Sequence, residues 1–453
     1  YYGTVTGVIA TVISVFIVFG SILIVTGGGK TFMDLALLLA GKRVGGPAKV
    51  AVVSSGMFGL VNGSAAANVA VTGNFTIPMM KKLGYRPAFA GAVEAVASTG
   101  GQLVPPIMGA AVFVMAEIIN TPYSTIMKAA VIPAFLYYLC ALMSVHFWSK
   151  KHRLLGLPQE VIAASAGDVL SVRRLLPLVA PIVVLLVMVI RGYTPQTAGF
   201  WAIVLAIGLF LVLDSRSFGE KLSVLYKGFV NGGKGLIMMA ILGACSQIIV
   251  SVIGQTGLGV RFSSFISSMN QTNLFIGLIF AMVIVLILGM GIPTVAAYVV
   301  SASVVAPPLV TAGLDPLTVH LFLFYFALIS GITPPVCTSV YVAAAIARTG
   351  WWETAVNSLK IGLSGFLVPY IFIYGDELLM RGSAGEVLLA VVTAAIGVTA
   401  LSAAMMGYLL RDNRMYESLL LFIGALLMTI PGLLTDVIGM AIIVLVLGLQ
   451  YFS

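Results

Sequence analysis

The sequence predicts an all-α polytopic membrane protein with two inverted-topology repeats, each holding a re-entrant helical hairpin and a helix broken at Pro-Pro. Three observations predict this fold: an apolar composition, uncharged stretches of membrane-spanning length, and turn residues that recur at a fixed separation. The 453 residues are 60% hydrophobic and 9% charged, with a mean hydropathy of +1.11, whereas soluble domains carry about 25% charged residues. A soluble fold is therefore excluded, and the lipid bilayer is the solvent of the chain.

Several uncharged apolar stretches have the length of a membrane-spanning helix. A spanning helix needs about 17 to 25 apolar residues. Stretches that approach or exceed this length are residues 4–26, 129–149, 175–190 and 194–213. The predicted protein is therefore a multi-pass protein of a bacterial or archaeal cytoplasmic (inner) membrane.

The repeat is visible in the spacing of glycine and proline. From Gly84 to Gly313 the separation is 229 residues, and the same separation relates Pro87 to Pro316 and the pair Pro105-Pro106 to Pro334-Pro335. A register without gaps over about 145 residues indicates an internal duplication. We expect a first repeat at 1–148, a cytoplasmic linker with two connecting spans at 149–232, a second repeat at 233–375, and accessory membrane helices at 376–453.

Each repeat is expected to contain a span, an interfacial arm, a hairpin, a broken helix and one intact helix. The arms are predicted at residues 32–40 and 260–269. The first hairpin pairs residues 50–61 with 65–80, and these arms are too short to cross a bilayer singly. The two predicted hairpin tips are Asn62-Gly63-Ser64 and Gly289-Met290-Gly291-Ile292-Pro293-Thr294.

The charges predict that the two hairpins enter from opposite sides. Five crossings are expected between them, at residues 87–118, 125–148, 175–190, 194–213 and 233–255. With the positive-inside rule, all 24 Lys and Arg lie on the cytoplasmic side except Lys128, Arg191, Arg261 and Arg381. The basic residues that give the net charge of +9 thus lie in loops and do not form a binding face. No nucleic-acid partner is expected. Inverted repeats of this kind are typical of secondary transporters.

The breaks and tips carry the residues that suit ion and substrate chemistry. Non-helical backbone survives at membrane depth only where it is buried or lines a polar cavity. Freed carbonyls and hydroxyl oxygens suit a monovalent cation, and the helices that follow the breaks present positive dipole ends that stabilise a carboxylate. The alternative interpretation is that these prolines only kink packed helices.

Glu94 is the carboxylate that lies clearly inside a predicted span, seven residues after Pro87 and so about 10 Å deep. Intramembrane acids are candidates for function. Glu94 is a candidate proton carrier or neighbour of a cation site, and the alternative is a structural acid that is hydrogen-bonded between packed helices. No Lys or Arg is predicted in the membrane core, so an anionic substrate would depend on dipoles, hydroxyls and bound cations.

Enzyme and metal-site motifs are not found in the sequence. It has no HExxH or GxSxG motif, and Gly27-Gly28-Gly29-Lys30-Thr31 lacks the leading glycine of a phosphate-binding loop. Cys140, Cys245 and Cys337 lie far apart in apolar segments, and we expect them to be small core residues. The protein is therefore predicted not to be an enzyme, and no cofactor is expected apart from a coupling cation.

The hairpin and break motifs resemble the large membrane subunit of tripartite ATP-independent periplasmic (TRAP) transporters, with the nearest likeness to the TAXI branch. The resemblance covers about residues 4–375 and weakens after Tyr374. It rests on residues 59–68 (GLVNGSAAAN), 76–78 (TIP), 94–102 (EAVASTGGQ), 104–106 (VPP), 289–294 (GMGIPT) and 331–336 (GITPPV).

The resemblance implies an elevator mechanism, in which hairpins and broken helices carry substrate across a fixed scaffold. It implies a periplasmic solute-binding protein of TAXI type as partner, and a small membrane subunit fused ahead of this chain in a 4TM/12TM permease. The implied substrates are small carboxylates such as dicarboxylates, keto acids and acidic amino acids. Many relatives carry Asp where this chain has Asn68, which leaves both Na⁺ and H⁺ coupling open, the latter through Glu94.

Two sets of candidate residues follow from the motifs and the resemblance. Substrate-binding candidates are Asn62, Gly63, Ser64, Asn68, Gln102, Gly291, Thr294 and Thr333. Na⁺ candidates are Ser64, Asn68, Ser98, Thr99, Gly100, Gly289, Gly291, Thr294, Ser330 and Thr333.

Two other functions fit the same repeat physics. One is an ion-coupled carboxylate carrier that works without a binding protein. The other is an ion channel, since re-entrant segments also build selectivity filters, although channels place the filter on an axis between subunits.

Overall fold

A computed structural model describes residues 3–60, 63–166, 168–257, 260–261, 264, 268, 273–430 and 432–452. Within these residues the regular elements are helices, apart from one isolated bridge between Tyr408 and Asp412. Eight helices of this part are long and apolar enough to cross a membrane. The chain is therefore a multi-pass helical membrane protein, as its composition predicts.

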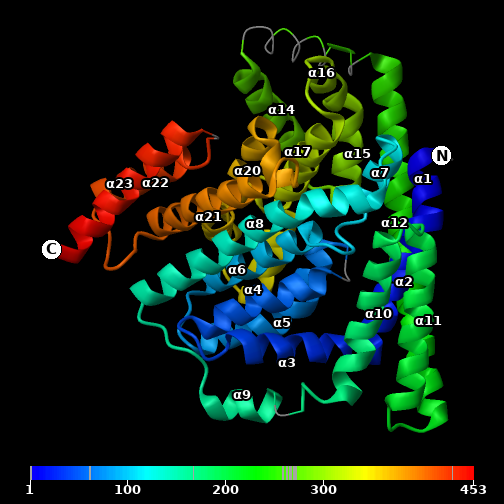
Figure 1. The fold of residues 1–453 in the computed structure, drawn as a ribbon. Coiled ribbons are helices and arrows are strands. Elements are labelled where there is room, and N and C mark those ends of the chain that lie inside the picture. The colour runs from blue at the N-terminus through cyan, green and yellow to red at the C-terminus, as the bar shows by residue number, and fades with distance from the viewer. Residues whose placement is uncertain are drawn as a thin grey trace.

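The chain begins with a helix that turns sharply into the predicted arm. Helices α1 (Thr4–Val8) and α2 (Ser14–Leu23) are joined by a π-helical turn, and a second one, Ile24–Gly28, leads into α3 (Gly29–Ala40). Gly27 takes a φ of 107° at this corner, a conformation that a residue without Cβ adopts readily. Figure 1 shows α3 leaving α2 at a wide angle, which confirms a separate arm helix.

Two pairs of short helices form at the predicted hairpins. Helix α4 (Gly46–Gly59) packs against α5 (Ala65–Lys82), and α14 (Leu274–Leu288) packs against α15 (Thr294–Val304), which is followed by α16 (Ala306–Thr311). With 14 and 15 residues, α4 and α14 are about 21 and 23 Å long, less than the ~30 Å of a bilayer core. Both predicted arm pairs are confirmed as helices.

The two broken helices have matching boundaries. Helix α6 (Pro87–Gly100) and the 3₁₀ turn η3 (Gly101–Leu103) correspond to α17 (Pro316–Ile329) and η4 (Ser330–Ile332), each shifted by the 229 residues that separate Gly84 from Gly313. After the Pro-Pro pairs the chain resumes as α7 (Ala111–Ile118) and α18 (Thr338–Ala347). The predicted breaks are confirmed at both places.

One predicted span is much longer than expected. Helices α8 (Tyr123–Lys151), α10 (Val172–Ile190) and α11 (Pro195–Leu213) agree with the expected spans, and a short helix, α9 (Gln159–Ala166), lies in the linker. Helix α12 (Phe218–Thr256), however, begins well before the predicted residue 233. Ser217 and Glu220 form a capping box that starts the helix early, so the polar segment before the span is helical too.

Glycines on α12 allow this long helix to lie close to α2. A Cβ at Gly228 would come within 2.8 Å of Ile22 Cδ1, and one at Gly243 within 2.1 Å of Ile9 Cδ1. Gly232 and Gly235 face Val18 and Ile17 in the same way. Small residues at such spacing let membrane helices approach closely, so α2 and α12 form a tightly packed pair.

The last helix of the second expected repeat forms one apolar span, residues Trp351–Tyr374, with a local interruption at Gly362. Helix α19 (Trp351–Ile361) ends before Gly362, and α20 (Ser364–Tyr374) follows at once. Gly362 sits against Ile332 of η4, and a Cβ there would lie 3.0 Å from Ile332 Cδ1. The low helix propensity of glycine and this close approach to the broken helix account for the interruption.

The C-terminal segment folds as three helices on one flank of the molecule. Helix α21 (Ala384–Met406) packs along α8, while α22 (Met415–Leu427) and α23 (Leu433–Phe452) pack on each other and extend away from the centre in Figure 1. The 3₁₀ turn η5 (Asp376–Leu379) leads into this unit. The predicted accessory apolar segments are thus helices.

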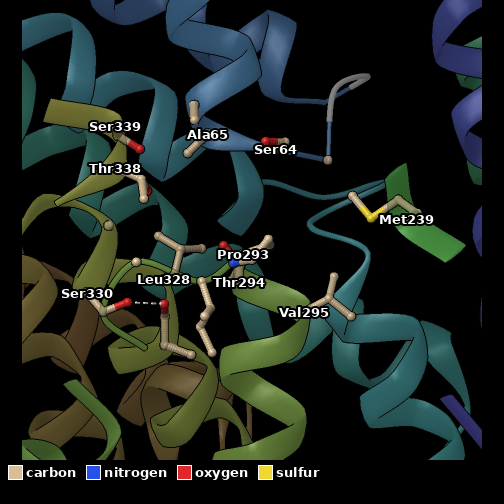
Figure 2. A pocket seen from close by; sticks show the side chains of 16 residues that line it. Ser64, Ala65, Met239, Pro293, Thr294, Val295, Leu328, Ser330, Thr338 and Ser339 are labelled. Atoms are coloured by element: carbon tan, nitrogen blue, oxygen red, sulfur yellow. Dashed lines mark hydrogen bonds between the residues drawn. The ribbon is translucent and has the colours of Figure 1, made fainter. Parts of the chain in front are cut away.

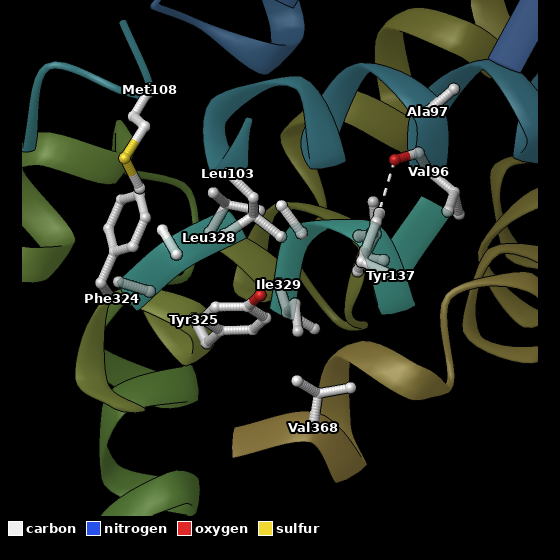
Figure 3. Close-up of a cluster of buried hydrophobic side chains, with 14 of the residues drawn as sticks. Val96, Ala97, Leu103, Met108, Tyr137, Phe324, Tyr325, Leu328, Ile329 and Val368 are labelled. Carbon is white, nitrogen blue, oxygen red and sulfur yellow. Dashed lines mark hydrogen bonds between the residues drawn. The ribbon is translucent and has the colours of Figure 1, made fainter. Parts of the chain in front are cut away.

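The remaining helices form two groups that meet at the hairpin tips. Helices α1, α2, α10, α11 and α12 pack together on the right of Figure 1, and the hairpins and broken helices form the centre. A buried cluster joins the two broken helices (Figure 3). In this cluster Tyr137 of α8 donates a hydrogen bond to the Val96 carbonyl of α6 (3.0 Å), and Tyr325 of α17 packs near Val368 of α20.

The cysteines agree only in part with the predicted core positions. Cys140 and Cys337 are buried, but Cys245 is exposed. Cys245 lies on α12, one side of which faces away from the rest of the chain, so its apolar neighbours in the sequence are no guide to burial.

Candidate functional site

A small cavity lies where the two hairpin tips come together. It has a volume of about 140 Å³ and is lined by residues of both tips, of the second break and of α12. Figure 2 shows Ser64 and Ala65 on one side, Pro293 and Thr294 below them, and Ser330, Thr338 and Ser339 opposite Met239. The structure therefore brings Gly63, Ser64, Gly291, Thr294 and Ser330, all predicted from the sequence, to one place.

A larger cavity of about 590 Å³ adjoins the first and separates the tips from the α2–α12 pair. The two cavities share Gly63, Ser64, Met239, Gly291 and Pro293. The larger one is closed on the other side by α2 and α12, with Phe16, Asn231 and Met238 among the residues that line it. None of the described residues that line the two cavities is charged.

Three helix N-termini open onto the smaller cavity. Helix α5 begins after Ser64, whose hydroxyl accepts a hydrogen bond from the Ala67 N–H (3.4 Å); α15 begins at Thr294 and α18 at Thr338. The first N–H groups of a helix have no intrahelical acceptor, and the dipole places partial positive charge there. Their convergence gives the cavity partial positive charge without any basic side chain, which is chemically suited to an anion.

A second polar cluster surrounds Glu94 behind the first tip. Glu94 is fully buried and accepts hydrogen bonds from four hydroxyls that three helices supply. Ser55 of α4 donates to Oε1 (2.7 Å), Thr72 and Thr76 of α5 donate to Oε1 and Oε2, and Ser98 of α6 donates to Oε1 (3.1 Å). The carboxylate is thus surrounded by hydroxyl donors, and none of these hydrogen-bond partners is a basic group.

Two of the predicted cation ligands belong to this cluster. Ser98 is one, and Asn68 is the other, because its amide donates to the Ser55 carbonyl (2.8 Å). Thr99 Oγ1 and Gln102 Oε1 are buried close by without a hydrogen-bond partner among the described residues. Gly100 lies against the Tyr137 ring, where a Cβ would come within 2.4 Å of Cε1, so its role in the structure is close packing.

The second break repeats part of this arrangement. Ser330 Oγ donates to the carbonyls of Gly289 (3.1 Å) and Ala327 (2.7 Å). Gly291 has a φ of 73° at the tip, and Thr333 donates to the Ile329 carbonyl (2.8 Å) and does not line either cavity. Gly289 and Ser330 therefore meet, whereas Thr333 lies apart. The predicted tip residue Asn62 lies outside the described residues.

Five polar residues near the site were not predicted. They are Ser55, Thr72 and Thr76 around Glu94, and Thr338 and Ser339 at the cavity. One signal could have found two of them, since Thr72 and Thr76 follow the predicted Asn68 at intervals of four residues and so share one face of a helix with it.

His320 is packed in the interior. It is buried on α17, and its Nδ1 is hydrogen-bonded to the Tyr298 hydroxyl of α15 (2.7 Å). This pair links the second hairpin to the second broken helix.

The sequence matches a known family over most of its length. The profile described as "Tripartite ATP-independent periplasmic transporter, DctM component" matches residues 1–382, and one described as "Domain of unknown function (DUF3394)" matches residues 387–442.

Three curated relatives are named as large permease proteins of this class of transporter. A C4-dicarboxylate TRAP transporter large permease protein of Pseudomonas aeruginosa is 25% identical over 334 residues, which cover 73% of this chain and 76% of the relative. A 2,3-diketo-L-gulonate TRAP transporter large permease protein of Escherichia coli is 23% identical over 362 residues (79% and 83%). A sialic acid TRAP transporter large permease protein of Vibrio cholerae is 22% identical over 363 residues (79% and 81%). The chain therefore belongs to the DctM family, the large membrane components of tripartite ATP-independent periplasmic transporters.

Proposed function

We propose that this permease takes up small carboxylates across a bacterial or archaeal inner membrane, driven by a cation gradient, with the substrate delivered by a periplasmic binding protein. The observation that carries the proposal is the convergence of the N-termini of α5, α15 and α18 on a cavity with no charged side chain among its described residues. Each N-terminus stabilises an anion by about 0.3–1 kcal/mol, and by more when water is excluded. Three together favour a carboxylate over a neutral solute.

The names of the relatives agree with this substrate class. They name C4-dicarboxylate, 2,3-diketo-L-gulonate and sialic acid as transported solutes. For this chain we propose a dicarboxylate, a keto acid or an acidic amino acid, since the small cavity of about 140 Å³ suits a compact solute more than a sugar acid.

We infer an elevator movement of two inverted repeats. The recurring boundaries of α6 with α17 and of η3 with η4 support the repeats. The large cavity between the tips and the α2–α12 pair supports a mobile surface facing a fixed one. In this proposal the hairpins and broken helices move together as the carrier, and α2, α10, α11 and α12 remain in place as the scaffold.

The coupling cation is proposed to be Na⁺, with H⁺ as the alternative. Na⁺ prefers oxygen ligands, and two buried oxygens, Thr99 Oγ1 and Gln102 Oε1, have no partner among the described residues. At the second break, the Gly289 carbonyl and Ser330 Oγ already lie 3.1 Å apart. Proton coupling would instead use Glu94, whose hydroxyl partners can adapt to either protonation state because a hydroxyl both donates and accepts.

Two partners complete the proposed transporter. Large permeases of this family work with a periplasmic binding protein and a small membrane subunit. We propose a binding protein of TAXI type and a small subunit fused ahead of this chain.

Reconstitution tests the proposal. The full-length protein is placed in liposomes, and uptake of radiolabelled succinate, 2-oxoglutarate and glutamate is measured with and without the cognate binding protein under separate Na⁺ and H⁺ gradients. We expect uptake of one acid that requires both the binding protein and one gradient. Uptake without the binding protein would favour a direct carrier. An ion current that does not depend on a solute gradient would indicate a channel.

A further inference from the structure

A basic pocket lies at the corner between α2 and α3, away from the proposed substrate site. Its volume is about 240 Å³, and it is lined by the corner residues, the start of α10 and the loop between α11 and α12. Its charged lining residues are Lys30, Arg173, Arg174, Asp214 and Arg216. Four basic side chains against one acidic side chain give the pocket a strong positive excess.

The ion pairs of the pocket leave two of these cations without a protein partner. Arg174 binds Asp34 of α3 at 2.6 Å, and Arg216 Nε lies 3.6 Å from Asp214 Oδ1. Lys30 and Arg173 make no hydrogen bond or ion pair with any described residue. Lys30 and Arg173 line the same concave space and are exposed, so an anion that enters it is attracted by both cations.

The corner in the backbone places a lysine at the same pocket. Gly27 bends the chain with a φ of 107°, and α3 starts at Gly29, so Lys30 lies at the pocket directly after the corner. Lysine together with arginine is a combination that binds phosphate. The motif Gly27-Gly28-Gly29-Lys30-Thr31 thus gains a role without the full nucleotide-binding loop.

The surroundings of the pocket point to a ligand with an apolar part. Pro177 and Leu178 complete the lining, and the adjacent Val172, Leu176 and Val212 are 69%, 39% and 79% exposed on α10 and α11. Such apolar side chains beside a spanning helix face lipid chains. The positive-inside rule places this end of the protein at the cytoplasmic leaflet, whose anionic lipids attract basic pockets between helices.

We propose that this pocket binds the phosphate of an anionic phospholipid of the cytoplasmic leaflet, with the acyl chains along α10 and α11. The lipid headgroup neutralises Lys30 and Arg173 and ties the α2–α3 corner to α10. It therefore anchors the scaffold at the membrane surface.

Native mass spectrometry of the full-length protein tests this site with phosphatidylglycerol and, as a zwitterionic comparison, phosphatidylcholine. We expect the native protein to retain phosphatidylglycerol. In the double variant Lys30→Gln/Arg173→Gln, the affinity for phosphatidylglycerol should fall about tenfold or more, because two charges are removed. The matched control Lys42→Gln/Arg43→Gln changes two exposed basic residues that do not line the pocket and should keep the affinity of the native protein.

Two outcomes would overturn the proposal. These are equal binding of phosphatidylcholine and unchanged affinity in the double variant. The single variant Arg173→Gln provides the same comparison, with a smaller expected loss, if the double variant does not yield folded protein.

Discussion

At the scale of single residues, the environment of Glu94 is the most informative feature. A buried charge is costly unless it is paired or well hydrogen-bonded, and four hydroxyls surround this carboxylate. The cluster joins α4, α5 and α6. A change in its protonation or ion occupancy would therefore alter the hydrogen bonds that hold the whole first hairpin.

If H⁺ is the coupling cation, we predict that Glu94→Gln abolishes the dependence of uptake on the gradient while the protein still folds. Glutamine keeps the shape of the side chain but cannot carry a proton or a negative charge. Gradient-driven uptake in liposomes should fall to the rate that is measured without a gradient. Glu353→Gln, a change at an exposed glutamate of α19, is the control, and full gradient-driven uptake by Glu94→Gln would show that the acid is only structural.

The contact between α4 and the first break depends on two glycines. A Cβ on Gly59 would come within 2.2 Å of Gly101 Cα, and a backbone atom cannot move aside as a flexible side chain can. We predict that Gly59→Ala destabilises the protein by about 1–3 kcal/mol through overpacking, seen as a lower midpoint of thermal unfolding in detergent.

Gly208→Ala is the matched control for this change. Gly208 lies in α11 and a Cβ there would meet nothing within 4 Å. Its substitution should leave the midpoint unchanged or raise it, because alanine favours a helix by about 0.5–1 kcal/mol over glycine. Equal effects of the two substitutions would argue against the close contact of α4 with the break.

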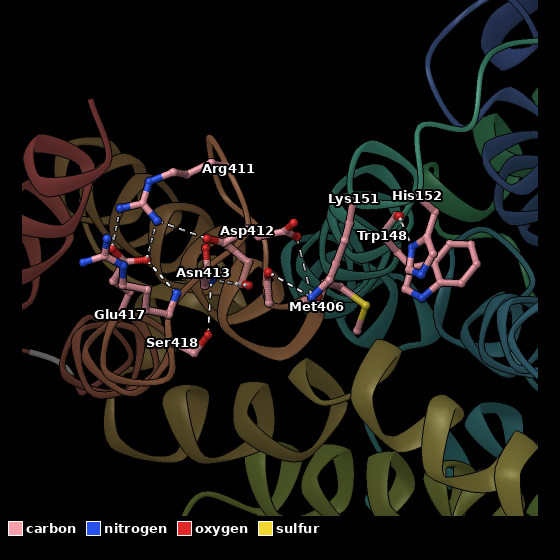
Figure 4. A network of polar contacts seen from close by, with 12 residues as sticks. Trp148, Lys151, His152, Met406, Arg411, Asp412, Asn413, Glu417 and Ser418 are labelled. Atoms are coloured by element: carbon pink, nitrogen blue, oxygen red, sulfur yellow. Dashed lines mark hydrogen bonds and ion pairs between the residues drawn. The ribbon is translucent and has the colours of Figure 1, made fainter. Parts of the chain in front are cut away.

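At the scale of elements, a buried ion pair holds the C-terminal helices together. Glu417 of α22 has no exposed surface and accepts hydrogen bonds from Arg411 (2.9 Å), from the Arg414 N–H (2.8 Å) and from Gln450 of α23 (3.0 Å). Figure 4 shows this network, with Lys151 at the end of α8 reaching the Gly407 carbonyl (3.2 Å). The network therefore ties the loop after α21 to both later helices.

We predict that Arg411→Gln loosens this unit. Removal of Arg411 takes two charge-assisted hydrogen bonds from the buried Glu417 carboxylate, at a cost of about 1–3 kcal/mol. Limited proteolysis should cut the loop between α21 and α22 faster than in the native protein. Arg191→Gln, at an exposed arginine after α10, should leave the rate unchanged, and equal protection of the loop in both variants would contradict a stabilising pair.

The start of α17 should respond to acid. Partial burial alone would raise the pKa of Asp315, but hydrogen bonds from the Thr318 N–H (3.0 Å) and from Arg381 (3.0 Å) outweigh this and hold the pKa below 3.8. The carboxylate therefore stabilises the fold above its unfolded pKa, and this contribution disappears as the pH falls through the lowered folded pKa.

Asp315→Asn should remove that acid-sensitive contribution. Asparagine still caps a helix but does not titrate. We predict a lower unfolding midpoint than native at neutral pH and a smaller further decrease on going below pH ~3.8, the ordinary aspartate range. A variant whose midpoint falls with acid as steeply as the native one would show that other groups control the response.

At the scale of the whole molecule, the features marked by glycine and proline could be predicted and those that depend on packing could not. The hairpin arms and both breaks follow from Pro87, Pro105-Pro106 and their counterparts, because proline and glycine act locally on the backbone. The early start of α12 has a local signal, the capping box of Ser217 and Glu220, which the prediction did not use. The interruption at Gly362 and the exposure of Cys245 depend on neighbours that the sequence does not identify.

The candidate site shows the same limit. Both tips were predicted and meet at one cavity, but the partners of Glu94 come from three helices, so only their assembled positions show the cluster. Thr338 and Ser339 begin α18 after the second Pro-Pro pair. Their positions depend on the direction that the chain takes after this pair, which the sequence does not give.

The central claim is that both hairpin tips move across the scaffold, and cysteine accessibility tests it most directly. Ser64→Cys and Thr294→Cys are made singly in a protein whose three native cysteines are replaced by serine, and labelled with a membrane-impermeant reagent from each side of oriented vesicles. Ser215→Cys, in the exposed loop between α11 and α12, is the control that should react from one side only. The account predicts that binding protein, substrate and a gradient change the side from which both tips react, whereas unchanged sidedness at both tips during uptake would contradict it.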